Sequence, residues 1–298
     1  MLVKRTDLAL EAKEIWQESA EKNSRLDGVK ATEKRSEGYP VTRVDILDRR
    51  GEQALGKAAG SYRTVDLTDF WRRRDGFFER AVRAVGTELK SLVPDHGSVL
   101  VVGLGNASMT PDAVGPLTVD HVLVTRHLLS AMPRHFSGFR SVSVLRTGVL
   151  GATGLESAET VQAVVAQTRP DLVIAVDALA SRRMSRVCAA VQLSDTGIAP
   201  GSGVGNHRAA LDQNALGVPV IAIGVPTVVD AATLAADLLE ESGMAEIDPE
   251  QLRQNHANFT VTPRDIDAQV RDLAKVVGYG INWALQELDI DEITALLS

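Results

Sequence analysis

Three unbroken apolar runs constrain the fold of this chain more than any other feature of its sequence. They are SVLVVGLG at 98–105, DLVIAVD at 171–177 and VPVIAIGVP at 218–226. Such runs, rich in Val and Ile and without polar alternation, are typical of strands that are buried on both faces of a sheet. Segments with the spacing of amphipathic helices separate the runs. We therefore predict an α/β fold.

The order of the elements predicts a three-layer architecture, because strand and helix alternate as in a largely parallel, twisted sheet with helices on its faces. Further strands are expected at 41–47, 139–145 and 186–193, and helices at 7–22, 75–93, 117–132, 156–167, 230–241 and from 262 onward. The charged first third, with few apolar positions between 24 and 40, is expected to form a small peripheral layer of strand and helix. Residues 8–298 are expected to form a single domain.

Charge and cysteine content exclude several classes of protein. The formal net charge is −7, which argues against direct binding of nucleic acid, since that affinity rests on clustered Lys and Arg. The basic cluster at 72–74 is interpreted as a solvated helix start. A single cysteine, Cys188, cannot form a disulfide within the chain, and no secretory signal or membrane-spanning run is apparent. We therefore expect a cytoplasmic protein with no membrane association.

Four glycine-rich, polar loops follow predicted strands and are the candidates for a functional site. In open α/β sheets, ligands bind beyond the carboxyl ends of the strands, where neighbouring loops converge. The loops span residues 103–116, 146–156, 177–183 and 194–206.

Common motifs do not account for these loops. Ser108 takes the place of the third glycine of GxGxxG after Gly103 and Gly105, and the glycines at 201–205 are followed by Asn206 and His207 rather than by the Lys of a P-loop. The sequence contains no GxSxG and no HExxH. The single Asp-Thr-Gly at 195–197 matches pepsin-like proteases, but those use two copies in an all-β fold. We interpret Asp195 as a turn or capping residue.

Asp112 and Asp177 stand out because both are expected at the same end of the sheet. Two carboxylates at close range in a sheltered cleft resist being charged together, so one pKa rises while the other group stays ionised. Such a pair supplies an acid and a base. From spacing alone, a turn at Asp112 and a helix cap at Asp177 are equally good interpretations.

Five blocks of the chain resemble the germination proteases of spore-forming bacteria. The blocks are GLGNASMTPDAVGP (103–116), RTGVLGATGLE (146–156), LVIAVDALASR (172–182), SDTGIAPGSGVGN (194–206) and VIAIGVPTVVDA (220–231). The similarity extends from residue 5 to residue 267. The resemblance implies an endopeptidase of the forespore or spore core that cleaves small acid-soluble spore proteins on germination. It also implies a homotetramer without cofactor or metal, and a distant relation in fold to hydrogenase-maturation endopeptidases.

The resemblance also assigns Asp112 and Asp177 as the catalytic pair. We hypothesise that the pair holds a water, one member serving as base and the other as acid, in an order that the sequence leaves open. Backbone NH groups of the glycine-rich loops are the expected oxyanion and substrate contacts. The loop residues assigned to this role are Gly103, Gly105, Asn106, Gly148, Gly151, Gly203 and Gly205.

The N-terminal segment resembles the propeptide junction of the family, which matures by removing a short leader. The expected cut lies between Asp7 and Leu8, so that residues 1–7 are the propeptide and Thr6 to Ala9 model a substrate. Asp7 as a helix cap is the plainer interpretation. Relatives carry a long insertion near 242–256, where this chain has only a short bridge.

Two rival hypotheses remain. One is a metal-dependent peptidase of the hydrogenase-maturation type, in which His121, His127 or His207 completes a site with the two aspartates. The other is a non-enzymatic protein, either a ligand sensor or a structural spore component. Insensitivity of the activity to chelation separates the first from the aspartate mechanism, and cleavage of a peptide removes the second.

Overall fold

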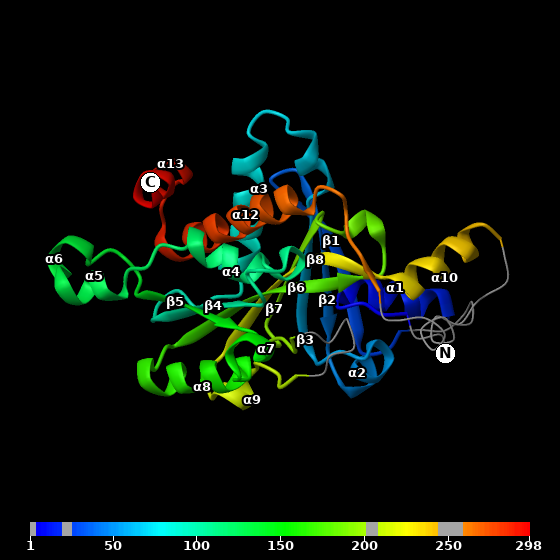
Figure 1. Ribbon diagram of the computed structural model, residues 1–298, viewed down its shortest axis with the longest axis horizontal. Helices are drawn as coiled ribbons and strands as arrows, with labels where there is room; N and C mark the ends of the chain where they lie inside the picture. Colours follow the sequence, from blue (N-terminus) through cyan, green and yellow to red (C-terminus); the bar gives the residue numbers. More distant parts are fainter. Residues whose placement is uncertain (1–3, 20–25, 201–207, 244–258) are drawn as a thin grey trace.

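One continuous mixed sheet forms the centre of the molecule (Figure 1). The computed structural model describes residues 4–19, 26–200, 208–243 and 259–298. The strands lie in the order β1-β2-β3-β7-β8-β6-β4-β5, and β9 pairs with β8. Their bounds are β1 (Val29–Ser36), β2 (Tyr39–Ile46), β3 (Gly60–Asp66), β4 (Val99–Leu104), β5 (Val142–Gly148), β6 (Leu172–Ser181), β7 (Ala190–Ser194), β8 (Val220–Asp230) and β9 (Thr260–Val261).

The sheet has two halves of different direction. Strands β5, β4, β6 and β8 are parallel to one another, whereas β7, β3, β2 and β1 continue the sheet through antiparallel pairings. The predicted α/β class with flanking helices is confirmed. The prediction of a largely parallel sheet holds only for the half formed by β5, β4, β6 and β8. The N-terminal strands extend the same sheet instead of forming a separate layer.

Helices cover both faces of the sheet. In Figure 1, α3 and α12 lie on one face, and α8 and α9 lie on the other. Helices α1 and α2 pack on the side of β2 and β3 that carries Val44 and Tyr62. The helices are α1 (Ala9–Ser19), α2 (Arg49–Leu55), α3 (Phe77–Lys90), α4 (Val114–Thr118), α5 (Arg126–Ala131), α6 (Pro133–Phe136), α7 (Leu150–Thr153), α8 (Ser157–Thr168), α9 (Gln213–Leu216), α10 (Ala231–Glu241), α12 (Ile266–Gln286) and α13 (Ile290–Leu297).

Side chains of the central strands alternate between the two cores, as expected for a period of two residues. Ile174 and Val176 of β6 pack into the core under α3 and α12. Val173 and Ala175 point to the opposite side, toward α8. Asp177 continues this second row. Its carboxyl therefore emerges from the face of the sheet that carries α8.

Hydrogen bonds from α12 break the helix that was predicted over 117–132. Asn282 of α12 accepts from Leu123 N at 2.8 Å and donates to His121 O at 2.8 Å, so these backbone groups are satisfied without a helix. Val122 is extended. Instead of one helix there are two short ones, α4 and α5, with a 3₁₀ turn after α4.

Two other sequence predictions differ from the structure because they depend on strand pairing between separate segments. The helix predicted from Thr262 onward begins at Ile266 as α12 and is followed by a separate helix, α13, because Thr260–Val261 pairs with β8 and keeps the chain extended. The charged segment 24–40, for which no strand was predicted, contains β1. That strand forms at an exposed sheet edge because Glu37 and Gly38, with φ of 51° and 87°, make a tight hairpin turn to β2. The short bridge near 242–256 lies largely outside the described residues.

Candidate active site

Asp112 and Asp177 are brought together by the parallel half of the sheet. Strands β4 and β6 are adjacent and parallel, so the loop that follows β4 returns beside the C-terminal part of β6. Asp112 ends a 3₁₀ turn in that loop. Asp177 lies within β6 rather than in the loop after it, because the strand continues to Ser181.

The Asp112 loop folds back on the end of β4 through a glycine. Gly105 has a φ of +106°, and a Cβ on this residue would lie 2.1 Å from Asp112 O, so only glycine fits. Asn106 N then donates to Asp112 Oδ2 at 2.8 Å. On the far side, Thr227 Oγ1 donates to Pro111 O at 2.6 Å and ties the loop to β8. The carboxylate of Asp112 is therefore held in a fixed position.

The two carboxyls line a cavity of about 280 Å³, whose wall also includes Asp7 from the N-terminal segment. The rest of the wall is mainly apolar, with a few polar groups. The residues that line the cavity besides the three aspartates are Leu104, Gly105, Met109, Pro111, Val149, Ser157, Ala178, Leu179, Ala180, Pro200, Arg208, Thr227, Val228 and Thr260.

Burial separates the acid strengths of the pair. Asp177 is only 4% exposed, and burial, followed by the negative charge of Asp112, raises its pKa well above the ordinary value. Burial also raises the pKa of Asp112, but the NH group of Asn106 and the positive charge of Arg208 oppose this rise. Asp177 is therefore the group that retains its proton to higher pH.

The N-terminal segment contributes Asp7 to this cavity and is held there by hydrogen bonds of its main chain and of the Asp7 side chain. Asp7 N donates to Ala180 O at 2.9 Å, and Ala180 N donates to Asp7 Oδ2 at 2.8 Å. Gln192 of β7 donates to Asp7 O and accepts from Ala9 N. Asp7 is therefore part of the site and not a helix cap: α1 begins at Ala9, and Thr6 Oγ1 accepts the NH of Leu8.

A second cavity of about 300 Å³ also has Asp7 in its wall. Lys57 lines this cavity together with Asp7 and Gln192. Burial lowers the pKa of the Lys57 ammonium, and the negative charges of Asp7 and Glu11 act against that shift. A cation thus stands near the acidic side chain that precedes the expected cut.

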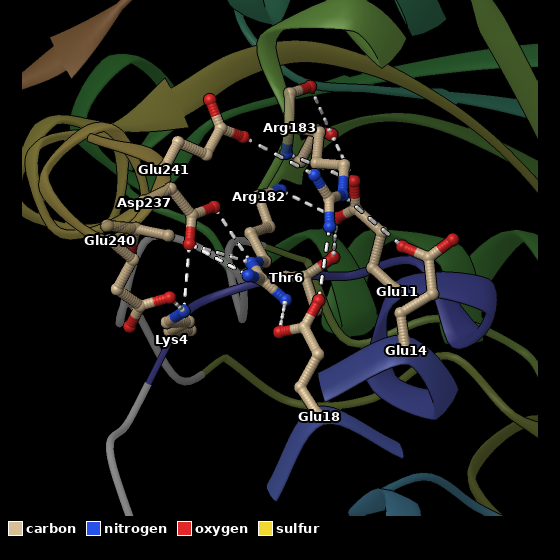
Figure 2. Close-up of polar contacts among 12 residues, drawn as sticks. Lys4, Thr6, Glu11, Glu14, Glu18, Arg182, Arg183, Asp237, Glu240 and Glu241 are labelled. Carbon is tan, nitrogen blue, oxygen red and sulfur yellow. Dashed lines mark hydrogen bonds and ion pairs between the residues drawn. The ribbon is translucent and has the colours of Figure 1, made fainter. Parts of the chain in front are cut away.

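A network of ion pairs ties the segment on both sides of Asp7 to the rest of the molecule (Figure 2). On the N-terminal side of Asp7, Lys4 Nζ lies 2.9 Å from Asp237 Oδ1 and 2.7 Å from Glu240 Oε2, both on α10. Arg182 of the chain after β6 contacts Asp237 at 2.8 Å as well. Lys4 and Arg182 therefore share one carboxylate of α10.

Helix α1 is tied to the chain that follows β6 by its glutamates. Buried Glu11 accepts from Arg182 N at 2.6 Å and from Arg183 N at 3.1 Å. Glu18 contacts Arg182 at 2.7 Å. Helix α1 is thus fixed to the strand that carries Asp177.

The glycine-rich loops differ in where they lie. Gly105 lines the cavity; Gly103 lies in β4, and Asn106 follows Gly105 in the loop, where its NH group contacts Asp112. Gly148 ends β5, and Gly151 lies in α7; Val149 between them lines the cavity. Gly203 and Gly205 lie outside the described residues. The oxyanion role of these NH groups stays a prediction.

Other residues singled out from the sequence have structural positions. Asp195 Oδ1 accepts from Ser61 N at 2.8 Å and joins β7 to β3. Burial raises the pKa of Cys188 to about 12, which leaves its thiol neutral.

His121 and His127 do not line the cavity, and His207 lies outside the described residues. Within the described ranges, no cluster of three or more His, Cys, Asp or Glu side chains could hold a metal. In the same ranges, no helix is long and apolar enough to cross a membrane.

The sequence analysis did not identify the residues that surround Asp7 and the aspartate pair. Gln192 and Lys57 were not predicted to take part, and Arg208 was not considered. One signal existed, because Gln192 is the polar residue of the otherwise apolar segment CAAVQL. Such a residue in a buried strand requires a hydrogen-bond partner.

Comparison with known proteins assigns the family. The model of the germination protease family matches residues 9–241. A germination protease of Caldanaerobacter subterraneus subsp. tengcongensis is 44% identical over 310 residues, which cover 95% of this chain and 94% of the relative. Germination proteases of Clostridium perfringens (39% identity; 99% of each chain) and Bacillus cytotoxicus (37% identity; 98% of this chain and 96% of the relative) are also similar.

Among solved structures, a NiFe hydrogenase maturation protease, HycI from Thermococcus kodakarensis KOD1, is similar at 17% identity. It covers 65% of this chain and 99% of its own, with a TM-score of 0.36. The family match over most of the chain and the nearly full-length relatives confirm the resemblance noted in the sequence. The chain belongs to the germination protease family of peptidases.

Proposed function

We propose that this chain is an endopeptidase of the spore core that cleaves small acid-soluble spore proteins during germination. We also propose that it is made as a zymogen which removes residues 1–7 from the domain formed by 8–298. The observation that carries the proposal is that Asp7 of the leader lines the same cavity as Asp112 and Asp177. The leader thus occupies the position that a peptide substrate would take.

The two carboxyls differ in a direction that supports peptide hydrolysis: burial raises the pKa of Asp177 well above its ordinary value, whereas the NH group of Asn106 and the charge of Arg208 oppose the rise at Asp112. Asp112, the more readily ionised, removes a proton from water, and the water oxygen bonds to the carbonyl carbon of Asp7. Protonated Asp177 gives its proton to Leu8 N as the carbon–nitrogen bond breaks. The products are a new carboxyl group at Asp7 and a new amine at Leu8. The raised pKa of Asp177 supports this order of roles.

The junction at Asp7 also models the substrate. Asp7 is the acidic residue before the cut, and it interacts electrostatically with Lys57. Leu8 and Ala9 after the cut are fully buried. This environment fits an acidic residue followed by an aliphatic residue and alanine, a sequence that the enzyme would also cut in spore proteins.

The test is incubation of the purified chain with a small acid-soluble spore protein and mass analysis of the fragments. We expect cuts after an acidic residue that precedes an aliphatic residue and alanine, and no cuts with Asp112→Asn or Asp177→Asn. Exhaustive chelation should leave the rate unchanged, since both proposed catalytic groups are carboxyls. An intact substrate after incubation with the wild-type chain would refute the proposal, and loss of activity on chelation would favour the metal-dependent alternative.

We propose in addition that the chain works as a homotetramer, as the resemblance implies, without direct contact to nucleic acid. Sedimentation of the purified protein over a range of concentrations measures the subunit number. A monomer at all concentrations would refute this part of the proposal without affecting the assigned reaction.

A further inference from the structure

Gln192 holds the main chain on both sides of the Asp7–Leu8 peptide. Its Nε2 donates to Asp7 O at 3.2 Å, and its Oε1 accepts from Ala9 N at 2.8 Å. Both contacts are made to backbone atoms and so do not depend on the side chains of the bound peptide. The carbonyl that accepts from Nε2 belongs to the bond that is proposed to be cut.

The strand register places Gln192 opposite Asp177 across one intervening strand. Asp177 of β6 pairs with Gly224 of β8, and Gly224 pairs with Gln192 of β7. Residues in register on adjacent strands point to the same side of a sheet. Val191 and Leu193, the neighbours of Gln192, face the core under α3 and α12, so Gln192 faces the opposite side, as Asp177 does.

The row of three residues places Asp177 and Gln192 on the same face of the sheet, two strands apart. Adjacent strands lie about 4.8 Å apart, so the backbones of β6 and β7 are roughly 10 Å apart at this level. The middle position is Gly224, and the side chain of Leu179 covers it, because a Cβ on Gly224 would lie 2.2 Å from Leu179 Cδ1. The peptide therefore does not lie on Gly224; Asp7 is held by hydrogen bonds to both flanking strands, to Ala180 of β6 and to Gln192 of β7.

We propose that Gln192 is a further catalytic residue of this hydrolysis, which binds the carbonyl oxygen of the cleaved bond and stabilises the negative charge on that oxygen during attack. This inference rests on the proposed function. The oxygen becomes an anion when water adds to the carbonyl carbon, and a hydrogen bond to an anion is stronger than one to a neutral carbonyl. A donor on a buried strand is preorganised, so the enzyme does not have to reorient it during the reaction.

The test compares self-cleavage of the full chain in the wild type, Gln192→Leu and Gln192→Glu, with exposed Gln167→Leu as the matched control. The measured quantity is the rate at which a chain beginning at Leu8 appears, followed by intact mass at several pH values. Loss of an oxyanion donor costs about 10²- to 10³-fold in rate. We expect Gln192→Leu to slow by that factor and Gln167→Leu to be unchanged.

Gln192→Glu separates a donor from a merely structural contact. A carboxylate accepts but cannot donate, whereas a protonated carboxyl can do both. The rate of Gln192→Glu relative to the wild type should therefore rise as the pH falls. If Gln192→Leu does not fold, this ratio still decides the question.

Equal rates in the wild type and in folded Gln192→Leu, or a ratio for Gln192→Glu that does not change with pH, would overturn the role of Gln192 and leave the proposed function standing. A wild-type chain that keeps Met1 under all conditions would overturn the self-cleavage on which both rest.

Discussion

The parallel and antiparallel halves of the sheet contribute different parts of the site. Asp112 and Asp177 come from the parallel half, from the loop after β4 and from β6. Gln192 and Lys57 come from the antiparallel half, from β7 and from the connection between α2 and β3. The segment around Asp7 contacts both halves, through Ala180 of β6 and Gln192 of β7. In the proposed mechanism the parallel half carries the proton transfers, and the antiparallel half binds and orients the chain that is cut.

Asp177→Asn should separate the roles of the two halves most clearly. Asp177→Asn keeps the size of the side chain but removes the acid, so self-cleavage should fall by at least about 10³-fold, within the range known for positioned acids and bases. Binding of the leader should persist, because Ala180 and Gln192 hold it. Rates from intact mass and hydrogen exchange at Asp7 N measure the two effects. Parallel loss of exchange protection would show that the halves are not separable.

The pH dependence sharpens the assignment within the parallel half. Burial and the charge of Asp112 raise the pKa of Asp177, so its protonated form dominates until the pH exceeds that raised value. Cleavage should therefore be fastest at mildly acidic pH and should decline as Asp177 ionises. A rate that increases steadily from pH 5 to pH 9 would contradict its role as the acid.

The free energy of unfolding should also change with pH as Asp177 titrates. A carboxyl with a raised pKa in the folded state contributes stability that is fully present below its unfolded pKa and is lost as the pH rises through the folded pKa. The free energy of unfolding of the wild type should thus decrease with pH relative to that of Asp177→Asn. The difference is about 1.4 kcal/mol for each unit of pKa shift, and denaturant unfolding at several pH values measures it.

Lys57 tests the antiparallel half. Lys57→Met should weaken the preference for an acidic residue before the cut, because it removes a cation that interacts electrostatically with Asp7. We expect Asp7→Asn to slow self-cleavage about 10-fold in the wild type and less in Lys57→Met, a coupling that a double-mutant cycle measures. Lys30→Met, at an exposed position of β1, is the control. Equal effects of Asp7→Asn in both backgrounds would exclude Lys57 from recognition.

The smallest expected effect concerns the leader alone. Burial would raise the pKa of Asp237, but hydrogen bonds from Arg182 and Lys4 lower it below its usual value. Lys4→Met removes one partner and leaves Arg182 in place, so the loss of unfolding free energy should be about 1 kcal/mol. Exchange protection of Asp7 N should decrease with it. An unchanged exchange rate would show that Lys4 does not help to retain the leader.

The sequence predicted the parallel half of the molecule better than the antiparallel half. Continuous apolar runs identified β4, β6 and β8, and the rule for strand ends led from them to Asp112 and Asp177. Strand β1 was missed because its side chains are charged and exposed, and its formation depends on a hairpin turn and on pairing with β2. Gln192 was missed because a polar residue within an apolar run reveals its partner only when the leader is placed beside it. Lys57 is distant in sequence from Asp7, and only the fold brings the two together.

Determination of the N-terminus after incubation at mildly acidic pH tests the central claim most directly, with the full-length wild type and Asp177→Asn side by side. We expect one new species that begins at Leu8 in the wild type and none in the variant. A wild-type chain that still begins at Met1, or equal processing of both proteins, would contradict that claim.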